Sequence, residues 1–467
     1  MTNESAFGGA VDLGKRIARG AATSTAATNL MLERIERLNG SLGCYELVMA
    51  EQALSDAKKA DREIKAKKVR GPLHGVPLAI KDLCDIEGVP TASGIPMFRS
   101  SIANRTSTVA ARLKAAGAVI LGKLQLTEGA LALHHPNIPP PVNPWRQDRW
   151  SGASSSGSGV ATAAGLCYGS LGSDTGGSIR FPSIANGCVG LKPTWGRVSR
   201  YGVFPLAETL DHVGPITRRV EDAAAILGAI AGRDENDPSS SSEAVPDYLA
   251  GIGKGLRGTI LGFDEQYCSA GVDPAIVKVL KKALSVLKKA GAVVKAVKMP
   301  PTEAAVTGWV PLCAVEAALA HTATYPSRKE DYGSVFAGFL ESGRAVSGVD
   351  YGRSAIERRN LRGAMQKLFT DIDLMIVPIM PWLNPSVGEF NALCESADGL
   401  QKLVHFTCIY DTTGQPTLTL PAGLDANASP IGFQIVARHF DEALLCRAGM
   451  AWQRAGGVHD DIPPLAL

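Results

Sequence analysis

Apolar positions recur along the chain with two spacings, one typical of helices and one typical of short buried strands. Residues 24–38 place leucines and an isoleucine at helical spacing and end at Asn39 and Gly40. The apolar run from Pro77 ends in polar Lys81, which predicts a short buried strand, 77–82. The same pattern predicts further helices: a charged one through about Lys67, 107–117, 353–370 and one from about 440. It predicts further strands at 118–121, 166–171, 373–378, 416–420 and 432–437.

Strands that alternate with helices in this way are typical of an α/β fold. The spacing of the elements indicates a parallel or mixed sheet that is covered by helices on both faces. The serine-rich stretch 234–247 predicts a surface loop or a boundary within the fold. Because the sequence has no internal repeat and no long linker, we expect one domain over residues 1–467.

The composition favours a large buried core and gives no sign of a charged partner. Of 467 residues, 45% are hydrophobic and 20% are charged, and the net charge is +3. This balance gives no reason to expect a nucleic acid or a membrane as partner. The nine cysteines include no C-x-x-C pair, which suits reduced, buried thiols better than disulfides. The start of the chain lacks a continuous apolar run, so we expect a cytoplasmic protein.

Two loops rich in serine and glycine, 151–159 and 172–180, flank one apolar stretch. The second loop runs through Asp174-Thr175-Gly176-Gly177-Ser178 into a predicted helix, whose first main-chain N–H groups are unpaired. Such donors can hold the oxyanion of a tetrahedral intermediate, and Ser178 beside them is a candidate nucleophile. The alternative is that Ser178 only caps the helix and that the glycines only form a tight turn.

A serine nucleophile needs a base, and none of the eight histidines lies in an evident catalytic motif. Lys81, at the end of its apolar strand, can serve as that base if burial keeps its amine neutral. Loops at the carboxyl ends of neighbouring strands meet in one crevice of an α/β sheet. A serine of the first loop can therefore relay a proton to Lys81 when the amine does not reach the nucleophile directly.

These residues and their surroundings resemble the amidase signature family of serine hydrolases. The resemblance rests on Lys81, on the run from Gly152 to Gly159 and on the run from Asp174 to Pro182. It extends over nearly the whole chain, through 71–77, 190–194, 211–215, 414–416 and 430–432. It implies one large α/β domain with a central mixed β-sheet, whose signature core spans about 71–222. It also implies hydrolysis of an amide through a serine acyl-enzyme, with no metal or organic cofactor.

Position by position, the resemblance implies Ser178 as nucleophile, Ser154 as a bridging serine after a cis peptide bond, and Lys81 as base. It assigns the oxyanion hole to the main-chain N–H groups of Thr175, Gly176, Gly177 and Ser178. It gives supporting roles to Ser155, Asp174 and Arg180. The sequence departs from the family pattern where alanine and serine replace glycines, at Ala153 and Ser156. Neither change removes a catalytic group.

The walls of the substrate pocket are expected from three variable segments, about 125–150, 305–345 and 375–410. Their apolar and aromatic side chains suggest a cleft for alkyl or aryl groups. The candidate lining residues are His134, Ile138, Trp309, Phe336 and Trp382. We therefore expect a small aliphatic or aryl amide, or a carbamate, as substrate. The resemblance leaves room for a homodimer, which no residue pattern indicates.

Two alternatives stay open at this point. One is the glutaminase subunit of a tRNA-dependent amidotransferase, which needs partner subunits and an acidic pocket for the amino group of glutamine. Where those subunits resemble one another in an aspartate ahead of Gly414, this chain offers Leu403-Val404-His405-Phe406, which disfavours that function. The other alternative is a catalytically silent binding protein on the same fold. The intact lysine and both serines argue against it.

Overall fold

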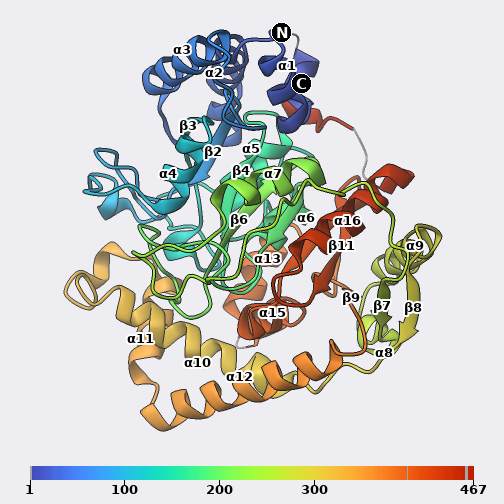
Figure 1. Cartoon of the computed structure of the whole chain (residues 1–467). Helices are drawn as coiled ribbons and strands as arrows, with labels where there is room; N and C mark the ends of the chain where they lie inside the picture. Colours follow the sequence, from blue (N-terminus) through green and yellow to red (C-terminus); the bar gives the residue numbers. More distant parts are fainter. Residues whose placement is uncertain (1–2, 397, 458–460) are drawn as a thin grey trace.

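One sheet of eleven strands runs through the part of the chain that the computed structural model describes, residues 3–396, 398–457 and 461–467 (Figure 1). From edge to edge its strands are β1 (Tyr45–Val48), β3 (Val119–Leu124), β2 (Pro77–Lys81), β4 (Ser170–Asp174), β6 (His212–Thr217), β5 (Val189–Lys192), β10 (Thr417–Leu424), β11 (Pro430–Ala437), β9 (Leu374–Val377), β7 (Ile260–Phe263) and β8 (Val293–Ala296). β2 pairs in parallel with β3 and β4, whereas β4 and β6 are antiparallel. The predicted α/β fold with a mixed sheet is confirmed.

Helices cover this sheet on both faces. Every residue of the central strands β2, β3, β4 and β6 is therefore buried. The helices are α1 (Ala10–Ala18), α2 (Ser24–Leu42), α3 (Ala50–Lys65), α4 (Thr108–Ala115), α5 (Ser156–Ala163), α6 (Arg180–Ala185), α7 (Val220–Ile230), α8 (Glu265–Ser269), α9 (Pro274–Lys289), α10 (Glu303–Ala320), α11 (Ser334–Ala345), α12 (Gly348–Leu368), α13 (Val387–Glu395), α14 (Gly399–Val404), α15 (Cys408–Thr413) and α16 (Glu442–Trp452). Predicted helix 24–38 is α2, which continues to Leu42 and ends at Gly43 in the left-handed conformation, φ 60°.

The strand predicted at 166–171 is displaced in the structure. Residues 166–169 form a turn, and β4 begins only at Ser170 and continues to Asp174. Leu166, Cys167 and Tyr168 are apolar because they belong to the core, with at most 1% of their surface exposed. The small residues of the true strand fit a crowded position, since a Cβ on Gly172 would lie 2.9 Å from the Ser155 hydroxyl. β4 thereby delivers Ser173 and Asp174 to the edge where β2 delivers Lys81.

A group of three helices, α10, α11 and α12, lies along one side of the molecule, away from α2 and α3 (Figure 1). Among the described residues, α10 alone is long and apolar enough to cross a membrane by length and composition. That test is weak evidence, because the core helix of a soluble protein passes it too, and α10 packs against both α11 and α12. Its importance here is that it carries Trp309 toward the serine loops.

Candidate active site

Lys81, the last residue of β2, lies at the centre of the serine cluster. Its side chain is completely buried, and Nζ lies within hydrogen-bond distance of the hydroxyls of Ser154 at 2.7 Å, Ser155 at 2.9 Å and Ser173 at 2.9 Å. The structure thus brings together the predicted Lys81, Ser154 and Ser155. Ser173 was not among the predicted site residues. The parallel pairing of β2 with β4 was the signal that could have found it, because it sets Ser173 beside the end of β2.

The electrostatics of this cluster favour a neutral amine. Burial lowers the pKa of Lys81 to about 7, against the weaker attraction of Cys84, Asp211 and Asp174, which raises it. About half of the Lys81 side chains are therefore uncharged near neutral pH. A lysine in this state can accept a proton, which an ordinary surface lysine cannot do at that pH.

The first serine loop is held against the sheet by main-chain contacts. The Ala153–Ser154 peptide bond is cis, as the resemblance implies. The N–H of Thr127 donates to the carbonyl of Ser154 at 3.1 Å. Gly152, with φ 85°, lies so close to helix α6 that a Cβ would come within 2.3 Å of Pro182. Only glycine therefore fits against α6 at this position of the first loop.

Asp174 and Arg180 hold the second loop in place through buried hydrogen bonds and ion pairs. The carboxylate of Asp174 accepts from the N–H groups of Gly177 at 2.6 Å, Ile179 at 2.9 Å and Arg180 at 3.3 Å. The guanidinium of Arg180 donates to Asp174 at 2.7 Å and to Asp411 at 2.5 Å, and all three side chains are fully buried. Burial works to raise the pKa of Asp174, but the guanidinium outweighs it and holds the pKa below its usual range. Neither Asp174 nor Arg180 lines the cavity of Ser178.

The predicted set of four oxyanion donors needs one correction. The N–H of Gly177 already donates to Asp174, so it is not a free donor. Within the part of the chain that the structure describes, the N–H groups of Thr175, Gly176 and Ser178 have no hydrogen-bond partner. The physical reason is that the carboxylate at the end of β4 captures the third N–H of the turn, as a helix cap does.

Ser178 borders a narrow cavity with apolar walls. The hydroxyl makes no hydrogen bond with any described residue, and 9% of the residue's surface is exposed. The cavity wall consists of Ser178, Thr175 and Gly176 together with apolar side chains: Ala130, Leu131, Ala132, Ala153, Phe181, Leu206, Trp309, Leu400, Leu403 and Val404. Among the described residues, no carboxylate and no basic side chain lines it. The cavity therefore suits an uncharged apolar group next to the Ser178 hydroxyl.

Comparison with known proteins agrees with this geometry. A family model described as Amidase matches residues 26–446, most of the chain. The chain belongs to the amidase signature family. Its activity is that of an amidase, and the buried contacts of Lys81 with serine hydroxyls fit the Ser-Ser-Lys triad of that family.

Relatives of this amidase cover nearly its full length. AmiD of Mycobacterium tuberculosis, provisionally named an amidase, is 43% identical over 95% of this chain and 93% of its own. A glutamyl-tRNA(Gln) amidotransferase subunit of Geobacter sp. is 36% identical over 95% and 96%. The structure of the peptide amidase of Stenotrophomonas maltophilia superposes with a TM-score of 0.81 at 28% identity, covering 98% of both chains. The amidase fold is therefore shared by relatives with different named reactions.

The five predicted pocket residues of this amidase do not share one cavity. Trp309 lines the cavity of Ser178. His134 and Ile138 line a neighbouring cavity of about 260 Å³, and His134 also lines a third, of about 200 Å³, together with Phe336 and Glu128. Trp382 instead packs against a separate cluster of buried apolar side chains and lines none of the three. The segment 131–134 lies between the cavities, because Leu131 and Ala132 also face Ser178.

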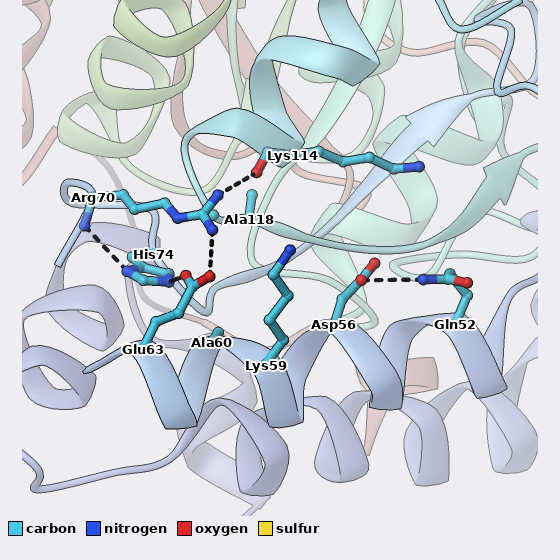
Figure 2. A pocket seen from close by; sticks show the side chains of 10 residues that line it. Gln52, Asp56, Lys59, Ala60, Glu63, Arg70, His74, Lys114 and Ala118 are labelled. Atoms are coloured by element: carbon cyan, nitrogen blue, oxygen red, sulfur yellow. Dashed lines mark hydrogen bonds and ion pairs between the residues drawn. The ribbon is translucent and has the colours of Figure 1, made fainter. Parts of the chain in front are cut away.

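A polar hollow between α3 and the end of α4 lies apart from this site (Figure 2). Part of its charge is paired, because Glu63 contacts Arg70 at 2.5 Å and His74 at 3.1 Å. His74 precedes β2, whereas Lys81 ends it, so the hollow lies at the opposite end of the strand from the serines. It supplies no group to the serine cluster.

Proposed function

We propose that this amidase hydrolyses small uncharged amides through an acyl-enzyme on Ser178, with Ser154 as proton bridge and Lys81 as base. The observation that carries the proposal is the buried amine of Lys81, with its lowered pKa, among three serine hydroxyls. Next to it lies an apolar cavity bordered by Ser178 and by main-chain N–H groups without a partner among the described residues. Those are the groups that acyl transfer requires: a proton acceptor, a hydroxyl and an oxyanion site.

The hydrogen bonds around Lys81 assign its lone pair. The Ser155 hydroxyl donates to the carbonyl of Ser173, so it can only accept from Lys81. A neutral amine has two N–H bonds, which serve Ser155 and the hydroxyl of Ser173. Its lone pair then remains for the hydroxyl of Ser154, the nearest of the three at 2.7 Å. With its proton directed at Lys81, the oxygen of Ser154 is free to accept the proton of Ser178.

The reaction follows from this arrangement. The oxygen of Ser178 bonds to the amide carbon while its proton passes to Ser154 and the proton of Ser154 passes to Lys81. The oxyanion is stabilised by the N–H groups of Thr175, Gly176 and Ser178. Lys81 returns the proton through Ser154 to the nitrogen of the leaving group, and the C–N bond breaks. Water then attacks the ester on Ser178, and its proton passes through Ser154 to Lys81.

The walls of the cavity argue for an apolar acyl group. Leu403 and Val404, ahead of Gly414, contribute hydrocarbon where the ammonium of glutamine would need a carboxylate. We therefore favour aliphatic or aryl amides, and carbamates of similar shape, over glutamine. The glutaminase function remains the second candidate because of the 36% identity to the Geobacter protein.

Two further expectations remain proposals that support this function. A cytoplasmic location agrees with nine free cysteines, eight of them buried. A single domain over residues 1–467 agrees with the one sheet that runs through the described residues. We also expect this domain to act without a nucleic acid or a membrane, as a monomer or a homodimer.

The test is a substrate panel with matched variants. Butyramide, phenylacetamide, an aryl carbamate and glutamine are each assayed with the wild type, Ser178→Ala and Ser342→Ala. Ser342 is an exposed serine of α11 whose hydroxyl donates to the carbonyl of Phe339 in the same helix. We expect turnover of an apolar amide, its loss in Ser178→Ala and its retention in Ser342→Ala. Turnover of glutamine alone, or activity in Ser178→Ala, contradicts the proposal.

A further inference from the structure

Two consecutive carbonyls of the oxyanion loop are held by side chains from distant elements. The indole Nε1 of Trp309, on α10, donates to the carbonyl of Thr175 at 2.9 Å. The hydroxyl of Thr407 donates to the carbonyl of Gly176 at 2.5 Å. Both donors are buried, with 2% and 0% of their surface exposed. The loop is therefore fixed from outside at the residues that offer its free N–H groups.

A fixed carbonyl determines where the next N–H points. The carbonyl of Thr175 and the N–H of Gly176 belong to one planar trans peptide, in which the two groups point in opposite directions. An indole that holds the carbonyl on one side therefore turns the N–H of Gly176 to the other side. In the next peptide group, Thr407 holds the carbonyl of Gly176, and the N–H is that of Gly177, which donates to Asp174. The bond from Trp309 thus governs a free donor, whereas the bond from Thr407 does not.

We infer that Trp309 is a positioning residue, which aims the Gly176 N–H at the oxyanion of the reaction proposed above. The inference rests on that proposed function, and it adds a residue from a variable segment to the machinery. The same indole also lines the cavity of Ser178. A single side chain thereby links the shape of the acyl pocket to the geometry of the oxyanion hole.

The packing around Trp309 leaves the indole little freedom. A Cβ added to Gly176 would lie 2.6 Å from Cζ2 of the ring, so the loop packs directly against the indole. Further along α10, Glu316 accepts from the N–H and the hydroxyl of Thr209, both at 2.7 Å. Those bonds tie α10 to the core, so the ring cannot follow the loop if the loop shifts.

Trp309→Phe tests the inference, because it removes the N–H donor and keeps a smaller aromatic ring in the wall. The matched control is Trp452→Phe, since Trp452 is equally buried and its Nε1 donates to the carbonyl of Pro421 at 2.9 Å, away from the serines. We expect kcat to fall about tenfold in Trp309→Phe with KM within about twofold, and no change of either constant in Trp452→Phe. Both variants should lose similar thermal stability.

Inhibitor pairs separate positioning from general damage. An aldehyde with the acyl group of the best amide adds to Ser178 and forms an oxyanion, whereas the corresponding alcohol only fills the cavity. Trp309→Phe should weaken the aldehyde about tenfold and the alcohol less than twofold. Should this variant not fold, benzothienylalanine at position 309 replaces the N–H by sulfur in a ring of the same shape.

The outcomes are distinct. A loss confined to KM, an equal loss for aldehyde and alcohol, or an equal kcat loss in Trp452→Phe overturns the inference about Trp309. If Ser178→Ala remains active, the proposed function fails instead. If Ser178→Ala is inactive and Trp309→Phe is fully active, only the positioning role is wrong.

Discussion

The pH dependence of turnover follows directly from the burial of Lys81. Only the neutral amine has a lone pair that can accept the proton from Ser154, so kcat/KM should follow the neutral fraction of Lys81. With the pKa lowered to about 7, about nine tenths of the amine is neutral at pH 8 and about one tenth at pH 6. We therefore expect kcat/KM to rise about tenfold from pH 6 to pH 8 and then to level off.

The same burial sets the size of the catalytic benefit. An exposed lysine with a pKa of 10.5 would be only about 0.3% neutral at pH 8. Removal of Lys81 from water therefore increases the neutral fraction by about two to three orders of magnitude. The contacts with Ser154, Ser155 and Ser173 are formed by hydroxyls rather than carboxylates, so no neighbouring negative charge within hydrogen-bond distance opposes this effect.

The assay measures initial rates on an uncharged amide from pH 5.5 to 9.5 at constant ionic strength. Lys192→Met is the control, because burial also lowers the pKa of Lys192 to about 7, but its Nζ donates to the carbonyls of Pro193 and Gln415 and, among the described residues, to no serine hydroxyl. The midpoint near pH 7 should persist in this variant. A flat profile, a midpoint near pH 10, or a midpoint that disappears with Lys192 would refute the assignment of Lys81 as base.

The remaining predictions concern stability, packing and specificity. Lys81→Met should be inactive. Because the pKa of Lys81 is lower in the folded than in the unfolded protein, the free energy of unfolding of the wild type should rise with pH between about 7 and 10.5. Lys81→Met has no such group, so any excess of its unfolding free energy over that of the wild type, measured in urea, should shrink by about 1.4 kcal/mol per pH unit over that range. A constant difference contradicts this. Gly176→Ala should cost at least about 1 kcal/mol and about 100-fold in kcat, since its methyl would lie 2.6 Å from Trp309; Gly338→Ala on α11, with nothing within 4 Å, should cost neither. Equal effects of both alanines on kcat would count against the contact. Val404→Asp should lower kcat/KM for apolar amides at least tenfold by placing a carboxylate in the cavity, and unchanged rates would show that the acyl group lies elsewhere.

Local pattern was sufficient for the elements that carry the lysine and the serines. The polar end of an apolar run placed Lys81 at the end of β2, and the serine-glycine loops were found because their composition is unusual. The strand predicted at 166–171 failed because apolar residues mark burial in a turn as well as in a strand. β4 itself, Ser170–Asp174, has one large apolar residue, Leu171, among small and polar ones, and the crowded contact with Ser155 explains its Gly172.

The parts of the site that depend on tertiary packing could not be predicted. The capture of the Gly177 N–H by Asp174 depends on how the turn closes, which composition does not specify. Trp309 was expected as a pocket wall, but its bond to Thr175 spans 134 positions of sequence. Likewise, the division of the predicted pocket into separate cavities depends on the path of residues 131–134.

The central claim, that Ser178 carries the acyl group and Lys81 activates it through Ser154, is tested most directly by labelling. The protein is treated with a fluorophosphonate, and peptide mapping by mass spectrometry locates the adduct in the wild type and in Lys81→Met. The account predicts one adduct, on Ser178, formed at least about 100-fold more slowly in Lys81→Met. An adduct on Ser154, Ser155 or Ser173, or equal labelling rates in the two proteins, would contradict it.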